Sequence, residues 1–474
     1  MEFSTEKIAA ECVNAINASI NSLQTLNIIV VGKTGVGKST LVNAIFGDEL
    51  ATTGMGKPVT TYMTKINKEG FPVNIYDTRG FELGKDAQVE VRNEIITTIK
   101  DGIKSKDVNQ QIHCIWYCVN TATNRIEPEE IEWLREFSKE NQITNVPVIL
   151  VLTQSFSKKN AAAMKEYIAN EKLDVIDIVP VLAKDYDIDD ELTIPSYGLE
   201  DLIQVMADTL PKELRDTLMN TQRASLNLKR YYAREAVALA TSAAFGEGFI
   251  PIPFADSAVL IPTQIAMVAS ITAVYGLRVD RGIIVAFTSS LLGTAGATYA
   301  GRAIASSLVK LIPGAGTLVG GAISGSTAAL ITKSLGEMYM ILMELLWLGE
   351  INSAELQTEA GRAKLRQMIS ERLKDRSSDE SKLPDNYTLS DILTLPEGMD
   401  LPESIQKLPQ TMQSMTESVT STVSATVKAV TESQSFNDLK DKVIPKDSKL
   451  GKFIRVYQIL SEEEAKEKAG SSEE

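Results

Sequence analysis

A glycine-rich segment near the start of the chain has the residue types and spacing needed to bind phosphate. Residues 32–40 read GKTGVGKST, which matches the phosphate-loop pattern G-x-x-x-x-G-K-[ST]. An apolar, β-branched run at residues 27–31 precedes the loop and is typical of a buried strand. Residues 41–46 follow the loop and are typical of the first turns of a helix. In this context backbone N–H groups surround a phosphate at a helix N-terminus, where the helix dipole favours negative charge. The segment therefore predicts a nucleoside triphosphate site rather than a chance glycine-rich turn.

The residues of this loop are the first candidates for contacts to the nucleotide. We expect Lys38 to reach the β- and γ-phosphates and the Ser39 hydroxyl to ligate Mg²⁺. The other candidate nucleotide-binding residues of the loop are Gly32, Lys33, Thr34, Gly35, Val36, Gly37 and Thr40.

A second apolar strand ends in the pattern D-x-x-G at Asp77 and Gly80. Asp77 can hold Mg²⁺ through water, and the Gly80 amide can sense the γ-phosphate. Between the two motifs lies a Thr-rich segment in which Thr60, with Thr61 as the alternative, can close over the metal. The expected metal site therefore combines Ser39, Thr60 and Asp77. D-x-x-G alone is common, but this order and spacing after a phosphate loop are specific.

With these motifs, residues 26–210 resemble the translation-factor-related class of P-loop GTPases, in its Era-like and septin-like bacterial branch. The resemblance implies an α/β domain with a mostly parallel sheet and helices on both faces. It also implies GTP/GDP and Mg²⁺ as ligands and hydrolysis of GTP to GDP and phosphate. In that activity Lys38 and Thr60 take the catalytic roles.

The same resemblance places two base-reading loops after later strands, and the first departs from the family pattern. Where the family has [NT]-K-x-D after an apolar strand, this chain has TQSF at residues 153–156. Phe156 thus occupies the place of an Asp that would accept hydrogen bonds from guanine N1 and N2, so we expect weaker guanine selectivity. Thr153 and, in the second loop, Ala183 can still frame a purine, and Gln154 can lay its stem along the ring as the usual lysine does. Lys184 of the second loop completes the candidate nucleotide-binding residues.

A second departure concerns hydrolysis. The residue after D-x-x-G, often a Gln that orients the attacking water, is Phe81, which has no donor or acceptor. We therefore expect slow hydrolysis, or hydrolysis that needs a group from elsewhere. No catalytic base is identifiable: His113, the single histidine, is interpreted as a strand-end residue, and Arg79 and Arg125 as loop or surface residues.

Composition bounds the remaining possibilities. A length of 474 residues allows two or three domains, and a net charge of −14 disfavours nucleic acid as the main partner. Three cysteines without pair spacing argue against disulfides and against a zinc site. The N-terminus lacks the apolar core of a signal peptide and instead has apolar residues at helical spacing. We expect an amphipathic helix over residues 1–25 and a cytoplasmic protein.

Beyond the GTPase-like region, residues 211–350 are predicted to form an all-α, Ala/Gly-rich apolar domain. Three uncharged stretches, at 257–277, 282–301 and 311–332, are long enough to cross a bilayer as helices. They are rich in Ala, Gly, Ser and Thr, so their insertion into a membrane is marginal. Two interpretations stay open, a membrane-associated domain and a tightly packed soluble bundle.

The segment FIPIPFAD at residues 249–256 resembles the start of an uncharacterised apolar domain appended to many bacterial GTPases, usually described as membrane-associated. Residues 351–474 are predicted to be a charged helix, a polar linker and an acidic tail.

These features predict a GTP-dependent switch that couples nucleotide state to a helical, membrane-associated domain. The alternatives are a nucleotide-licensed effector that perforates or remodels membranes, and a soluble GTP-regulated protein-interaction module. We expect a membrane or protein partner through residues 223–350, and a second copy of the chain through the GTPase-like region.

Overall fold

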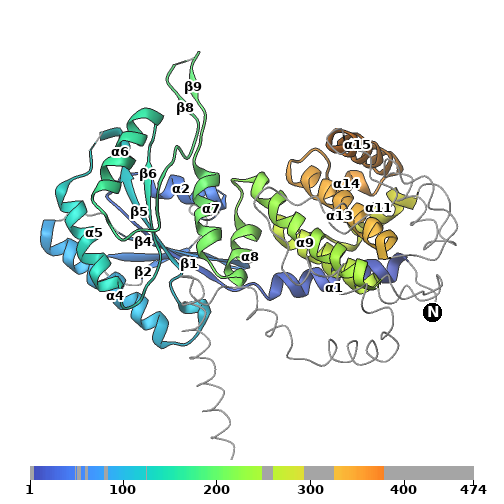
Figure 1. The fold of residues 1–474 in the computed structure, drawn as a ribbon, viewed down its shortest axis with the longest axis horizontal. Coiled ribbons are helices and arrows are strands. Elements are labelled where there is room, and N and C mark those ends of the chain that lie inside the picture. Colours follow the sequence, from blue (N-terminus) through green and yellow to red (C-terminus); the bar gives the residue numbers. More distant parts are fainter. Residues whose placement is uncertain are drawn as a thin grey trace, which may run out of the picture. The chain divides into compact units, whose positions relative to one another are not determined.

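The computed structural model describes residues 5–47, 50, 55–58, 62–78, 84–123, 125–189, 191–247, 260–292 and 325–377. Within them the chain forms a domain built on a seven-stranded sheet and a domain of packed helices (Figure 1). We call these the sheet domain and the helical domain.

The sheet has the strand order β2-β3-β4-β1-β5-β6-β7. Its strands are β1 (Leu26–Val31), β2 (Met55–Pro58), β3 (Met63–Lys68), β4 (Phe71–Thr78), β5 (Cys114–Asn120), β6 (Val148–Thr153) and β7 (Asp177–Pro180). The five strands from β4 to β7 in this order are parallel, whereas β2 and β3 pair antiparallel at one edge. In the register, Val30 lies beside Asp77 and Asn120 beside Thr153. The parallel strands therefore bring the residues that follow them to one edge of the sheet.

The central strand β1 is buried on both faces. Ile28 and Val30 belong to one apolar cluster, while Ile29 and Val31 belong to another, because successive side chains of a strand point to opposite faces. The first face is covered by α2 (Lys38–Phe46), α7 (Leu199–Thr209) and α8 (Lys212–Thr221). The second is covered by α4 (Gly84–Lys104), α5 (Pro128–Asn141) and α6 (Lys158–Asn170). The expected α/β fold with helices on both faces is confirmed.

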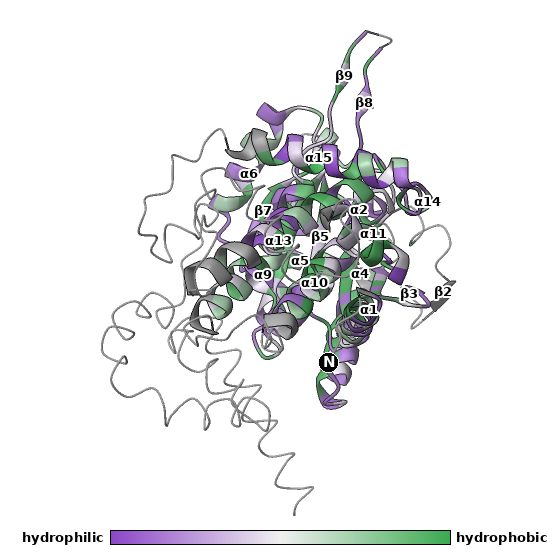
Figure 2. Ribbon diagram, turned by 90° about the vertical axis from the view of Figure 1, so that its right-hand side faces the viewer, coloured by the Kyte–Doolittle hydropathy of each residue, from purple (hydrophilic) through white to green (hydrophobic). Residues whose placement is uncertain are grey.

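Shorter elements complete the sheet domain. Two 3₁₀ turns, η2 (Val108–Gln110) and η3 (Thr121–Thr123), flank β5. Between β7 and α7 the chain forms the hairpin of β8 (Tyr186–Asp187) and β9 (Thr193–Ile194), which projects from the sheet domain in Figure 1. In Figure 2, β8 is hydrophilic and β9 partly hydrophobic.

The helical domain is assembled from segments on both sides of the sheet domain in the sequence. Its helices are α1 (Thr5–Asn21), α9 (Leu226–Glu247), α10 (Leu260–Tyr275), α11 (Arg281–Leu292), α13 (Gly325–Trp347), α14 (Ser353–Leu356) and α15 (Glu359–Ser377). Cys12 and Ile16 of α1 lie in one apolar cluster with Ile271 of α10 and Tyr339 of α13. The apolar stripe of the N-terminal helix thus packs in the helical domain, and the sheet domain is inserted between α1 and α9.

The two domain cores also extend beyond the boundaries expected from the sequence. Helix α8 follows residue 210, yet its Leu214 and Leu218 pack in the cluster that contains Leu26 of β1. Helix α15 falls in the segment expected to be a charged helix and linker, yet its Leu365 and Ile369 are buried in the helical domain. Composition shifts mark neither boundary, because both helices are charged on their outer faces and apolar on one side only.

Hydrophobic residues run through the strands and through the packed helices of the helical domain (Figure 2). Across the part of the chain that the structure describes, none of the helices combines the length and apolar character needed to cross a membrane. Residues 248–259, 293–324 and 378–474 lie outside the described residues, and with them the FIPIPFAD segment and most of the third uncharged stretch.

A buried carboxylate joins four helices of the helical domain. Glu344 on α13 is fully buried, and its carboxylate lies 3.0 Å from the Arg230 guanidinium of α9 and 3.4 Å from that of Arg372 on α15. The Tyr275 hydroxyl of α10 donates to the same carboxylate over 3.4 Å. A carboxylate withdrawn from water is tolerated only when it is paired and hydrogen-bonded in this way.

Replacing Glu344 with glutamine should therefore destabilise the helical domain. We expect a loss of roughly 2–3 kcal/mol in the free energy of unfolding, below the usual cost of breaking a buried pair because both arginines can reach water. Urea unfolding followed by circular dichroism measures it. The matched control is Glu350→Gln, which removes a partly exposed partner of Arg372 and should change the same quantity by less than about 1 kcal/mol. Equal effects of the two substitutions would contradict the assignment of Glu344 as the central buried charge.

Candidate functional site

The predicted phosphate loop lies between β1 and α2 and curls around the ammonium group of Lys38. Lys38 Nζ donates to the carbonyl oxygens of Gly32 over 2.9 Å and Lys33 over 3.2 Å. Gly32 has a φ of +148°, and a Cβ there would lie 2.6 Å from the carbonyl oxygen of Cys118 on β5. Only glycine allows the chain to turn this close to the neighbouring strand.

Helix α2 begins directly at the loop. Gly37 is its N-cap residue and makes no side-chain capping hydrogen bond, so the first amide groups of the helix remain available to a bound anion. Thr34, Gly35 and Thr40 are exposed, whereas Val36 is buried beneath the loop. The structure thus brings the predicted loop residues together at a helix N-terminus, an arrangement that can hold a phosphate.

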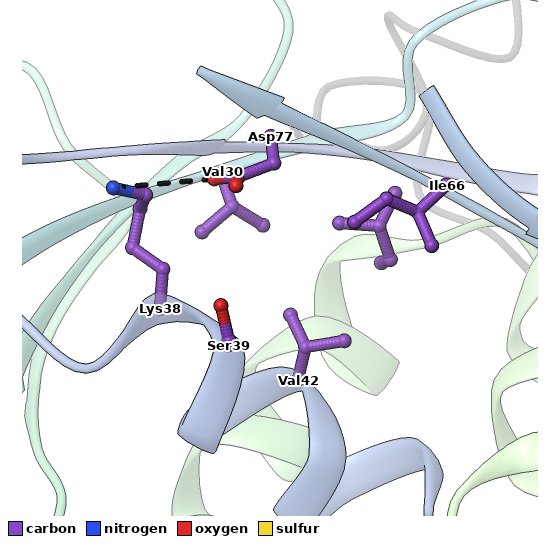
Figure 3. Close-up of a pocket in the computed structure, with 7 residues that line it drawn as sticks. Val30, Lys38, Ser39, Val42, Ile66 and Asp77 are labelled. Atoms are coloured by element: carbon purple, nitrogen blue, oxygen red, sulfur yellow. Dashed lines mark ion pairs between the residues drawn. The ribbon is translucent and has the colours of Figure 1, made fainter. Parts of the chain in front are cut away.

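Asp77 at the end of β4 faces the start of α2 (Figure 3). Lys38 and Ser39 point toward it, and Asp77 Oδ1 lies 4.0 Å from Lys38 Nζ. The same oxygen is buried and has no hydrogen-bond partner among the described residues. Burial raises the pKa of the Asp77 carboxyl, and the nearby Lys38 charge opposes that rise. These three residues line a small pocket whose floor includes Val42 and Ile66.

This donor set fits a magnesium ion. A carboxylate and a hydroxyl are hard oxygen ligands of the kind that Mg²⁺ prefers, and it usually completes its shell with waters and substrate phosphates. The unpartnered, buried Asp77 oxygen is a polar atom that such an ion would satisfy. The further predicted ligand, Thr60, and the predicted γ-phosphate contact, Gly80, lie outside the described residues, as do Thr61, Arg79 and Phe81.

The first base-reading loop is hydrogen-bonded to the phosphate loop. Thr153 Oγ1 at the end of β6 donates to the carbonyl of Val36 over 2.6 Å. Gln154 has a positive φ of 51°, and its Nε2 donates to the carbonyl of Gly35 over 2.8 Å. The side chain of Gln154 therefore lies along the phosphate loop. Gln154 stands at the position where the family pattern has a lysine.

Phe156 packs against an aromatic residue from the second half of the domain. Its ring centroid lies 4.4 Å from that of Tyr186 on β8, a residue that the sequence motifs did not single out. Ala183, which is half-buried, and Lys184, which is exposed, precede this strand. The two base-reading loops lie side by side, because the Ser155 amide donates to the Val181 carbonyl over 3.2 Å.

Two further residues support the loops and were not found by sequence reasoning. Glu130 on α5 lies 3.1 Å from Lys33 Nζ, so the side chain of this loop lysine is directed to a neighbouring helix. Thr121 is buried, and its hydroxyl donates to the carbonyl oxygens of Thr153 and Gln154 over 3.0 Å each. Neither residue belongs to a motif, and both act on residues distant in sequence.

The other basic candidates lie away from the phosphate loop. His113 precedes β5, at the end of the sheet opposite the loop, and its Nδ1 accepts a hydrogen bond from the Asn27 amide over 3.0 Å. Burial lowers its pKa to about 4, so it is neutral near pH 7. Arg125 is paired with Glu127 and exposed. Both positions agree with the structural interpretation of these residues rather than a catalytic one.

Comparison with known proteins identifies the family of this site. Residues 27–154 match the model of the family described as 50S ribosome-binding GTPase. This part of the chain is therefore a P-loop GTPase domain. The match covers the phosphate loop, Asp77 and the start of the TQSF loop, and it confirms the GTPase family predicted from the motifs.

Several curated proteins resemble this GTPase domain. The tRNA modification GTPase MnmE of Janthinobacterium sp. (strain Marseille) is 38% identical over 128 residues, which cover 27% of this chain and 25% of that protein. GTPase Era of Clostridium kluyveri is 25% identical over 191 residues, 39% of this chain and 56% of Era. Septin-12 of Homo sapiens is 24% identical over 192 residues, 35% of this chain and 52% of the septin. The chain thus spans between a quarter and about half of the length of these relatives.

Solved structures of GTPases also align with part of the chain. Era from Aquifex aeolicus bound to GDP.AlF4- is 20% identical, covers 47% of this chain and 68% of its own, and has a TM-score of 0.26. Toc33 from Arabidopsis thaliana in complex with Mg²⁺ and GMPPNP is 18% identical, covers 46% and 93%, and has a TM-score of 0.25.

Proposed function

We propose that this chain is a GTP-binding and GTP-hydrolysing switch whose nucleotide state is passed to the helical domain. The arrangement of Lys38, Ser39 and Asp77 around one pocket at the start of α2 carries this proposal. The hydrogen bonds from Thr153 and Gln154 support it, because they fix the base-reading loop to the phosphate loop.

The residues of the chain have separate tasks in this activity. Lys38 donates to two loop carbonyls and is positioned to exchange them for β- and γ-phosphate oxygens. Mg²⁺, held by Ser39 and Asp77, would neutralise charge on the phosphates. The open N-terminus of α2 adds backbone N–H donors, so the site stabilises the triphosphate by positioning and charge rather than by covalent chemistry.

A hydrogen bond joins the described residues that follow the two expected switch segments. The Tyr62 amide, two residues after Thr60, donates to the carboxylate of Glu94 on α4 over 3.2 Å. Helix α4 is the element that follows the D-x-x-G segment. A γ-phosphate that orders Thr60 and Gly80 would therefore act directly before two elements, the start of β3 and helix α4, that are hydrogen-bonded to each other.

Phosphate release from GTP tests the proposal directly. Purified protein should release phosphate from GTP in the presence of Mg²⁺, and EDTA should abolish the release. Ser39→Ala should lose activity at low Mg²⁺. Thr40→Ala, at the neighbouring exposed position, should retain it, because the contact expected from Thr40 is made by its backbone amide, which the substitution leaves in place. Absence of Mg²⁺-dependent phosphate release at every protein concentration tested would refute the proposed hydrolysis.

Base preference should be looser than in GTPases with an intact fourth motif, because Phe156 replaces the guanine-reading carboxylate. We expect GTP to be preferred over ATP by less than about 10⁴-fold, a ratio that requires dedicated polar recognition. Competition binding against a fluorescent GTP analogue measures it. Phe156→Asp should increase the preference and Phe156→Leu should not. A wild-type preference above that ratio would mean that another acidic residue reads the base.

The proposal also includes the partners expected from the sequence. We propose that the helical domain contacts a membrane or protein partner, that a second copy binds through the GTPase domain, and that the protein is cytoplasmic and membrane-associated. Flotation with liposomes in each nucleotide state tests the membrane contact. Nucleotide-dependent leakage of the same liposomes would favour the alternative of a membrane-perforating effector, and the absence of both would favour a soluble interaction module.

A further inference from the structure

The C-terminal end of α10 in the helical domain is held by side chains from one short segment. The last carbonyl groups of an α-helix have no partner within the helix. Here the carbonyl oxygens of four consecutive residues, 273–276, each accept a hydrogen bond from a side chain of residues 220–229. The donors are Asn220 Nδ2 to Ala273 (2.7 Å), Lys229 Nζ to Val274 (2.9 Å), Arg223 Nη1 to Tyr275 (3.2 Å) and Arg223 Nη2 to Gly276 (3.1 Å).

The backbone of this helix end also touches that segment. Gly276 has a φ of +63°, and a Cβ on it would lie 1.9 Å from the carbonyl oxygen of Asn220. Lys229 is fully buried and donates as well to the carbonyl of Met219 near the end of α8, over 2.6 Å. Lys229 Nζ thus donates to a carbonyl group near the C-terminal end of each helix, so its two hydrogen bonds hold α8 and α10 end to end.

Arg223 makes a second connection, to the helix that begins at the phosphate loop. Its backbone amide donates to the carbonyl oxygen of Ile45 over 2.6 Å. Ile45 lies in the last turn of α2, whose first residue is Lys38. Arg223 therefore binds the ends of two helices, α2 through its backbone and α10 through its guanidinium.

The sheet domain and the helical domain are joined on the other side of α8 too. Thr217 Oγ1 donates to the carbonyl of Gln24, in the link between α1 and β1, over 2.7 Å. Helix α8 is thus hydrogen-bonded to the link between α1 and β1 and leads directly into the link that carries Arg223. The bonds of Arg223 give a short route from α2 to α10.

We propose that Arg223 is a positioning residue that couples the phosphate-loop helix α2 to the C-terminal end of α10. This inference rests on the proposed function, because the coupling acts between nucleotide binding and the helical domain. Coupling between two sites is reciprocal. Nucleotide at the phosphate loop therefore stabilises the end of α10, and the bonds from Arg223 to α10 strengthen nucleotide binding.

Hydrogen exchange and nucleotide affinity, measured on the full chain, test this coupling. The probe is a non-hydrolysable GTP analogue with Mg²⁺. In the wild type it should slow the exchange of the amides near residues 272–276, and Arg223→Met should remove that response. The same substitution should weaken analogue binding by about 5- to 30-fold, toward the low end of typical allosteric coupling.

Matched variants separate coupling from folding. Arg278→Met deletes an exposed positive charge just beyond α10 and should leave both quantities unchanged. Arg223→Lys keeps the charge but lacks the two-pronged guanidinium, so it should retain the fold and show an intermediate response. Arg223 is itself exposed, so its replacement leaves no cavity.

The outcomes are distinguishable. If the wild type binds the analogue but the end of α10 does not respond, or if both Arg223 variants respond as the wild type does, the coupling is refuted and the proposed function stands. If the wild type binds no analogue, both fall.

Discussion

Replacing Lys38 with alanine should abolish detectable binding of a non-hydrolysable GTP analogue. The substitution removes the ammonium group that the phosphate loop holds 2.9 Å from the Gly32 carbonyl and 4.0 Å from Asp77. Loss of one partner from a desolvated charge pair weakens binding by about 2–5 kcal/mol, which corresponds to a dissociation constant raised by roughly 30- to 4,000-fold. Calorimetric or fluorescence titration with the analogue measures the change.

The phosphate loop supplies its own control for this experiment. Lys33 is also a loop lysine, but its ammonium group lies 3.1 Å from Glu130 on α5. Lys33→Ala should therefore change the dissociation constant far less than Lys38→Ala does. Near-native affinity of the Lys38 variant, or equal losses in the two variants, would overturn the assignment of Lys38 as the phosphate-binding residue.

The sequence was most informative where chemistry depends on local spacing. The strand, glycine loop and helix from β1 to α2 follow from residues that are adjacent in the chain, and each has the expected position. The ends of β1, β4 and β6 also meet, because parallel strands bring their carboxyl ends to one edge. The D-x-x-G motif and the family resemblance had predicted Asp77 and Thr153 as nucleotide-site residues, and the strand register brings both beside the loop.

The contacts that connect the two domains could not be predicted in this way. The apolar stripe of α1 was recognised as a helix face, but its spacing does not say which surface it covers. Arg223 contacts Ile45 and Gly276, residues far away in the sequence, and no periodicity or motif marks it. Tyr186, which packs on Phe156, was missed for the same reason.

Hydrolysis should be slow in dilute protein and should rise with protein concentration or with liposomes. The reason is Phe81, which cannot orient a water molecule and which lies, like Thr60, outside the described residues. His113 is neutral near pH 7, because burial lowers its pKa to about 4, and it lies at the other end of the sheet from Lys38. A group missing from such a site is commonly supplied in trans, and it can raise the rate by about 10³–10⁵-fold.

Specific activity measured against enzyme concentration, with and without liposomes, tests this expectation. An activating second copy gives a specific activity that rises with concentration, whereas an activating membrane raises it at a fixed concentration. Glu82→Ala serves as the check on the nearest polar residue in the sequence, and Glu69→Ala, at an exposed turn between β3 and β4, as its matched control. Fast turnover that is independent of concentration and liposomes, and unaffected by Glu82→Ala, would mean that the chain carries its own catalytic group. A polar group elsewhere in the GTPase domain would then have to orient the attacking water in place of the residue at position 81.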